Sequence, residues 1–197
     1  MFNLARSICA AALIALPLSA TADLSEVPSG KYALDSSHGY ITFTYSHLGF
    51  SNPRIGFNSF DTVLDLDTDN PGSSSVEVTI DATSIDSRVA EFNEHLNGAD
   101  FFNTAEYPTI TFKSTTVEAT GDNTFDVTGD LTILGTTKPV TLATTITKAG
   151  NHPLRNVPTV GVSASTGLMR SEWGLGAYVP AVSDEVELSI EVELLAE

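Results

Sequence analysis

The chain has 197 residues, of which 25 are acidic and 9 basic, giving a formal net charge of −16 at pH 7. A surface this acidic repels nucleic acids and anionic membranes, so neither is expected as a partner. The single cysteine, Cys9, lies near the start of the chain. Composition therefore argues against a nucleic-acid-binding protein and against a disulfide-linked scaffold.

The first 22 residues are typical of a secretory signal peptide. Arg6 is basic, residues 8–18 are an apolar run, and Ala20 and Ala22 fit the small-residue cleavage rule. The run is shorter than the roughly 20 apolar residues that span a bilayer. We therefore expect export, cleavage after Ala22 and no stable membrane insertion. One domain over residues 23–197 remains, with 8 basic against 25 acidic residues and a net charge of −17.

Apolar residues recur at every second position along this domain and predict an all-β fold. We expect a bulge or bend at Gly56 and a turn of the chain at residues 135–139. About eight strands with short turns favour an antiparallel meander that closes into a barrel over a two-sheet sandwich. The predicted strand segments are residues 40–45, 55–66, 76–81, 109–113, 125–133, 140–146, 160–164 and 186–194.

One segment has helical periodicity instead. Apolar residues recur at helical spacing in residues 88–97, with Asp86 or Ser87 as the N-cap and Gly98 just past the end. Pro108 then ends any helix and begins a strand. We expect this short helix to lie against the mouth of the barrel.

The domain contains an ordered series of short motifs: YALDSSH (32–38), ITF (41–43), HLGF (47–50), GF-x-x-F (56–60), EHL (94–96), DFF (100–102), YPTITFKS (107–114), GDLTILGTTKPV (129–140), RSEWG (170–174) and DEV (184–186). In this order and spacing the set resembles the YceI-like family of exported bacterial proteins, and it covers nearly all of the domain. Where the family commonly has Asp-Phe-Gly, this chain has Glu172-Trp173-Gly174.

The resemblance implies a lipocalin-like antiparallel β-barrel with a long apolar pocket. It also implies a non-catalytic periplasmic protein that binds a polyisoprenoid, an isoprenoid quinone or a fatty-acid derivative, with a homodimer left open. The inward-facing rows and the resemblance together predict these ligand-binding residues: Ile41, Phe43, Tyr45, Phe57, Phe60, Val78, Ile80, Phe92, Phe101, Phe102, Ile110, Phe112, Leu131, Ile133, Leu142, Arg170 and Trp173.

Polar residues at a mouth of the barrel could hold a ligand's head group. Arg88 and Arg170 are the candidates, because an arginine fork suits an anionic or carbonyl group. In so acidic a chain, a structural salt bridge is an equally good interpretation of either arginine.

The evidence for catalysis is weak. The chain has no Gly-x-Ser-x-Gly motif and no phosphate-binding glycine loop. The spacing of the four histidines presets no metal site, and we expect His38 and His47 to bond backbone near strand ends. We therefore predict no catalytic residue, no cofactor and no metal. Two alternatives remain: an enzyme or redox accessory protein that acts on an isoprenoid quinone, with or without a histidine-bound metal, and a structural barrel filled by its own side chains.

Overall fold

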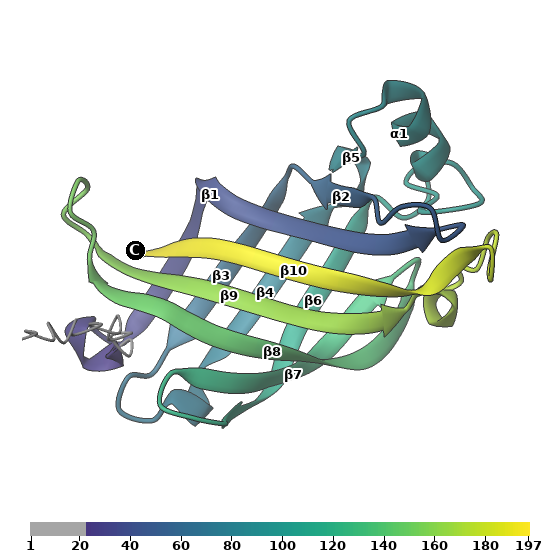
Figure 1. The fold of residues 1–197 in the computed structure, drawn as a ribbon. Coiled ribbons are helices and arrows are strands. Elements are labelled where there is room, and N and C mark those ends of the chain that lie inside the picture. Colours follow the sequence, from purple (N-terminus) through teal and green to yellow (C-terminus); the bar gives the residue numbers. More distant parts are fainter. Residues whose placement is uncertain (1–22) are drawn as a thin grey trace, which may run out of the picture.

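The computed structural model describes residues 23–197, so the predicted signal peptide lies outside the described residues. One antiparallel sheet curls until β10 pairs with β1, which closes a barrel (Figure 1). The predicted all-β barrel is therefore confirmed. Eight strands form its wall: β1 (Gly30–His47), β3 (Phe60–Leu66), β4 (Ser75–Asp81), β6 (Thr109–Ala119), β7 (Thr124–Ile133), β8 (Thr136–Asn151), β9 (Pro158–Met169) and β10 (Val182–Ala196).

The remaining elements are short. Strands β2 (Arg54–Phe57) and β5 (Ile85–Asp86) extend the sheet beyond β1, and the helix α1 (Ala90–Asn97) lies beside them at one end of the barrel (Figure 1). Among residues 23–197, none of the helices is long and apolar enough to cross a membrane. The 3-10 helices are η1 (Leu24–Glu26), η2 (Pro71–Ser73), η3 (Ala82–Ser84) and η4 (Arg170–Trp173).

The predicted helix exists, but its start was wrong. It begins at Ala90, and its N-cap is Val89, which makes no side-chain capping bond. Asp86 Oδ1 accepts from the Arg88 N–H at 2.7 Å, and Ser87 Oγ accepts from the Val89 N–H at 3.3 Å. The two predicted caps therefore fix the turn before the helix. Gly98 follows the last helical residue, as expected.

Two predicted interruptions of strands were also misplaced. Gly56 lies inside β2, paired with Thr42 of β1 and Asp86 of β5, and the break between β2 and β3 falls at residues 58–59. The turn predicted at residues 135–139 is only two residues long. Leu134 and Gly135 both have positive φ, as a tight hairpin turn requires, and residues 136–139 already belong to β8.

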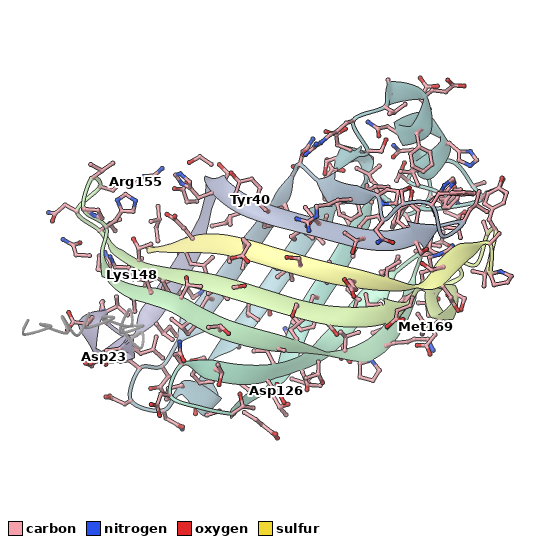
Figure 2. All side chains as sticks on the ribbon, viewed as in Figure 1. Asp23, Tyr40, Asp126, Lys148, Arg155 and Met169 are labelled. Carbon is pink, nitrogen blue, oxygen red and sulfur yellow. The ribbon has the colours of Figure 1, made fainter. Side chains whose placement is uncertain are left out.

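Alternation along the strands separates an apolar inner face from a polar outer face. On β6, Ile110 and Phe112 are buried, whereas Thr111 and Lys113 are exposed. Figure 2 shows the labelled side chain of Tyr40 projecting from the outer wall, where it is exposed. The predicted facing of these strands is therefore confirmed.

Strand β1 is irregular where it closes the barrel. Leu34 pairs with Leu194 of β10, but the next pair is Gly39 with Val192, so residues 35–38 lie opposite the single residue Glu193. Before this bulge β1 pairs with β3, and after it β1 pairs with β2. The bulge is therefore the point at which β1 exchanges one neighbour for another while it stays paired with β10.

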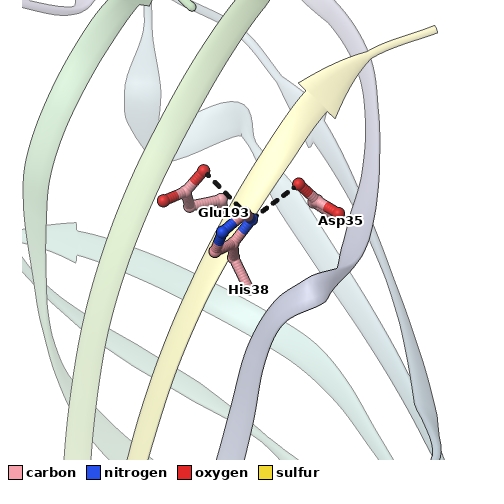
Figure 3. Close-up of side chains that lie close together, drawn as sticks. All are labelled: Asp35, His38 and Glu193. Carbon is pink, nitrogen blue, oxygen red and sulfur yellow. Dashed lines mark hydrogen bonds and ion pairs between the residues drawn. The ribbon is translucent and has the colours of Figure 1, made fainter.

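A buried carboxylate holds the bulge. Asp35 Oδ1 accepts from the Ser37 N–H at 3.1 Å and from the Ser37 hydroxyl at 2.6 Å. Asp35 Oδ2 lies 2.9 Å from His38 Nδ1 (Figure 3) and 2.8 Å from Arg155 Nη2 in the β8–β9 loop. The hydrogen bonds from Ser37, with those from His38 and the Arg155 charge, hold the pKa of Asp35 well below its usual range. His38 thus bonds a carboxylate inside a strand, not backbone near a strand end as predicted.

We predict that Asp35→Asn lowers the free energy of unfolding at pH 6 by roughly 2–4 kcal/mol, because it removes a buried, multiply bonded charge. The folded-state pKa is depressed, so this stabilisation is present above the ordinary pKa of 3.8 and is lost as the pH falls below it. Urea unfolding from pH 6 to pH 2.5 measures the difference between wild type and variant. A difference that does not shrink below pH 3.8 would contradict this role, and Asp61→Asn on the exposed outer face is the control.

Gly129 of β7 is a second position that the packing constrains. A Cβ there would lie 2.5 Å from the Lys113 carbonyl oxygen and 2.5 Å from the Phe112 ring. The ring therefore covers the glycine, and a side chain at residue 129 would push it out of place.

We predict that Gly129→Ala lowers the free energy of unfolding by about 1–3 kcal/mol, the usual cost of forcing atoms into a filled site. Chemical denaturation of the purified protein checks this. Gly167→Ala on β9 is the matched control, because a Cβ there would meet only the Glu185 carboxylate at 3.7 Å. Equal losses for the two variants would show that the contact between Gly129 and Phe112 is not the cause.

Candidate functional site

A cavity of about 540 Å³ occupies the inside of the barrel. It extends from Leu24 and Pro71 to His95 and Tyr178, and all eight wall strands contribute side chains to it. Its lining is almost entirely apolar. Protein interiors normally leave few voids larger than a water molecule, whereas this volume falls within the range of small-molecule sites. The cavity is therefore a candidate binding site.

The structure brings sixteen of the seventeen predicted ligand-binding residues to the cavity. The exception is Phe60, which is buried but does not line it. The Phe60 ring lies under the β1 bulge, 2.9 Å from where a Cβ on Gly39 would be. The sixteen are Ile41, Phe43, Tyr45, Phe57, Val78, Ile80, Phe92, Phe101, Phe102, Ile110, Phe112, Leu131, Ile133, Leu142, Arg170 and Trp173.

Three phenylalanines pack together on the cavity lining near α1. The ring centroids of Phe57 and Phe102 are 5.6 Å apart and nearly perpendicular, and Phe43 lies 6.1 Å from Phe57 and 6.4 Å from Phe102. Offset and edge-on arrangements of this kind are favourable for aromatic rings. The trio gives that part of the cavity an aromatic, apolar wall.

A second aromatic group lies at the end of the cavity beside α1. The His95 ring is 4.9 Å from Phe101 and 6.2 Å from Phe92, and Tyr178 stacks on Phe101 at 6.2 Å. Tyr178 and Leu48 line the cavity and are also exposed on the outer surface. The adjacent residues Phe101 and Phe102 therefore pack in different clusters: Phe101 with His95 and Tyr178 at the mouth, and Phe102 with Phe43 and Phe57 in the interior.

Arg170 lines the cavity, but its guanidinium is engaged by backbone. Nε donates to the Ser183 carbonyl at 2.8 Å, Nη1 to that of Leu175, and Nη2 to those of Ala177 at 2.9 Å and Val182 at 3.1 Å. Burial lowers the pKa of Arg170, which the charge of Asp184 partly offsets. The arginine thus ties the chain after η4 to the start of β10. The other predicted head-group residue, Arg88, is exposed and lies outside the cavity lining.

Trp173 fixes the same segment from inside. It is buried, and its indole Nε1–H donates to the Leu131 carbonyl of β7 at 3.2 Å. The ring therefore joins η4 to β7 and forms part of the cavity surface.

Sequence reasoning missed several residues of the lining. Tyr178 and Leu48 lie in irregular segments, where no periodicity shows which side chains face inward. Thr62 is different, because it shares the parity of Leu64 and Leu66 on β3. Alternation along β3 would have predicted that Thr62 faces inward. It was missed because only apolar residues were assigned to the inner face.

One cluster of possible metal ligands occurs among the described residues. Ligand atoms of Asp35, His38 and Glu193 lie within 4.8 Å of one another (Figure 3). Both Asp35 oxygens already accept hydrogen bonds, and the Arg155 guanidinium lies 2.8 Å from Oδ2. A cation would have to compete with that guanidinium, so the geometry is that of a structural ion-pair network.

Comparisons with known proteins identify the family. Residues 32–194 match the YceI-like domain. A UPF0312 protein of Azotobacter vinelandii is 37% identical over 184 residues, which cover 92% of this chain and 95% of that protein. Protein YceI of Escherichia coli is 39% identical over 159 residues, covering 81% of this chain and 82% of its own.

Solved structures share the fold. The Campylobacter jejuni YCEI protein superposes with a TM-score of 0.69 at 27% identity, covering 77% of this chain and 90% of that one. BcnA of Burkholderia cenocepacia superposes with a TM-score of 0.74 at 24% identity, covering 81% of this chain and 98% of BcnA. A domain of Saccharophagus degradans described as polyisoprenoid-binding superposes with a TM-score of 0.66 at 13% identity, covering 86% of this chain and 100% of that domain. The barrel and its internal cavity define the structural class, and the chain belongs to the YceI-like family.

We predict that Arg170→Lys lowers the free energy of unfolding by roughly 2–4 kcal/mol. The single ammonium group of a lysine cannot donate to all four carbonyls that the planar guanidinium reaches. The carbonyls that lose their hydrogen bonds would remain half-buried without a partner. Thermal and urea unfolding measure the loss. Arg54→Lys, at an exposed arginine of β2, is the control. Unchanged stability of Arg170→Lys would leave ligand contact as the better explanation of this residue.

Proposed function

We propose that this protein is an exported, non-catalytic binding protein that holds one long apolar or amphiphilic molecule inside its barrel. The observation that carries the proposal is the cavity of about 540 Å³, enclosed by all eight wall strands and lined by apolar side chains. The name given to the Saccharophagus degradans domain supports a polyisoprenoid as the ligand class. The signal-peptide pattern of residues 1–22 supports a periplasmic location.

Physical chemistry favours occupation of this cavity. The side chains around an empty space forfeit dispersion contacts, which is a cost to the folded protein. A chain-like hydrocarbon regains those contacts and contributes about 25 cal/mol for each Å² of apolar surface that it removes from water. An isoprenoid or fatty chain fits this lining better than a compact polar molecule, because polar groups would lose their hydration without gaining partners.

The chemistry of the lining favours binding over catalysis. Within the described part of the chain, the lining holds no Asp, Glu, Lys or Cys, and its arginine is engaged by backbone. Nucleophilic catalysis needs a nucleophile within reach of a base that a third group orients. The lining also contains Ser74 and Ser75 near Pro71, and His47 and His95, but among the described residues no hydrogen bond joins one of these serines to one of these histidines.

A matched pair of tryptophan substitutions tests the proposal. Ile190 of β10 lines the cavity, and its neighbour Ser189 has the opposite parity. Ile190→Trp fills part of the cavity, so we predict that binding of the fluorescent probe N-phenylnaphthylamine, and its displacement by farnesol, weaken at least about tenfold. Ser189→Trp should bind like wild type, with affinity in the micromolar range or tighter.

Fluorescence titration gives both affinities, and circular dichroism confirms that the two variants are folded. If wild type binds neither compound, or if Ile190→Trp binds as well as Ser189→Trp, the interior of the barrel is not the binding site.

A further inference from the structure

Thr62 interrupts the apolar inner face of β3. Phe60, Thr62 and Leu66 are buried, while the intervening Val63 is exposed. Thr62 is 5% exposed and Val63 is 41% exposed. Hydrophobic burial alone would favour the reverse order, with the valine inside and the threonine outside. The inward threonine therefore calls for an explanation other than core packing.

The Thr62 hydroxyl is buried and has no hydrogen-bond partner, alone among the buried side-chain polar atoms in residues 23–197. Two other polar groups of the lining have partners: the Thr144 hydroxyl donates to the Leu142 carbonyl, and the Trp173 indole donates to that of Leu131. An unpaired buried hydroxyl destabilises the folded protein, whereas a paired one does not. This hydroxyl is thus available for a partner that the protein itself does not supply.

Thr62 lies next to the point at which β1 and β3 cease to pair. The last pair between β1 and β3 is Ala33 with Val63, after which β1 turns away from β3. On its other side β3 stays paired with β4, where Thr62 lies opposite Val78. The hydroxyl therefore lies beside the place where the wall loses one strand-to-strand contact.

Thr62 lines the cavity. The hydroxyl oxygen is buried against protein in the structure, but rotation by about 120° about the Cα–Cβ bond moves it to the staggered position that the methyl group holds. This rotation needs no movement of the backbone, and it is the step by which the hydroxyl meets a molecule in the barrel. A threonine hydroxyl both donates and accepts a hydrogen bond, so it suits a carbonyl, a hydroxyl or an amide.

We propose that Thr62 is a polar anchor within the cavity, which hydrogen-bonds a neutral oxygen- or nitrogen-bearing group on an otherwise apolar ligand. This inference rests on the proposed binding function and narrows its ligand class. A charged group at Thr62 is disfavoured, because Arg170, the one Arg or Lys among the described lining residues, gives its donors to backbone carbonyls. The preferred ligand therefore differs from a plain hydrocarbon and from a lipid whose phosphate enters the barrel.

Two probes with the same carbon skeleton test the anchor: dihydrophytol, which carries one hydroxyl, and phytane, which carries none. Displacement of N-phenylnaphthylamine measures both affinities for wild type, Thr62→Val and Thr62→Ser. We predict that wild type prefers the alcohol about fivefold, as expected for one hydrogen bond. Thr62→Val, which is nearly isosteric, should lose this preference, and Thr62→Ser should retain it.

Thermal unfolding of the ligand-free protein supplies a second measurement. Thr62→Val replaces an unpaired hydroxyl with a methyl group, so its Tm should rise by roughly 2–4 °C. An equal preference for the alcohol in wild type and Thr62→Val, or no preference in wild type, would overturn the anchor while leaving the binding function intact. Failure of wild type to bind either probe would instead overturn the proposed function.

Discussion

Closure of the sheet by the pairing of β1 with β10 is the constraint on which the rest of the structure depends. An open sheet of this length would expose an apolar face and two unpaired edges. Closure removes those edges from the wall and encloses the inner face. To pair with β10 along its length, β1 bulges at residues 35–38. On its other side it pairs with β3 before the bulge and with β2 after it. The buried Asp35 carboxylate gathers Ser37, His38 and Arg155 around that bulge.

The cavity follows from which side chains closure directs inward. An eight-stranded barrel has an interior that its own side chains can fill or that can hold one small ligand. Here much of the inner wall carries side chains of modest reach, such as Val78, Ala164 and Val192, while many of the aromatic rings gather toward α1. At Gly129 the wall has no side chain, and two atoms of the Phe112 ring lie 2.5 and 2.8 Å from where a Cβ would be. The side chains therefore line the interior of the barrel without filling it, which leaves the cavity of about 540 Å³.

The sequence predicted the features that depend on local alternation. The antiparallel barrel, the inward rows of β6 and β10 and the short helix near the mouth all follow from periodicity, because each residue's facing is fixed by its own strand or helix. Twelve of the sixteen predicted residues that line the cavity lie in strands or in α1 and follow this rule. The other four, Phe101, Phe102, Arg170 and Trp173, lie in a turn or in η4, and the family resemblance contributed to their prediction. That these residues contact a ligand is a proposal, because periodicity shows which side chains point into the barrel and does not show whether a ligand is bound there.

Features that depend on contacts between distant segments could not be predicted in this way. The engagement of Arg170 by four carbonyls requires the fold of residues 175–183, which has no sequence periodicity. The exclusion of Phe60 from the cavity lining could not be foreseen either, because its ring packs against Gly39 of another strand, directly after the β1 bulge. The helix start at Ala90 was missed because Asp86 and Ser87, good caps by residue type, bond the preceding turn. The inward Thr62 was missed because inner faces were expected to be apolar.

The most direct measurement of the central claim is the native mass of the protein, purified from its own host without detergent. Native mass spectrometry reports the bound mass and the number of subunits together, and lipid extraction of the same sample identifies what was bound. The account predicts one long-chain, neutral-polar lipid for each subunit, released when the protein is unfolded. A mass equal to that of the polypeptide alone, with only traces of lipid in the extract, would contradict it.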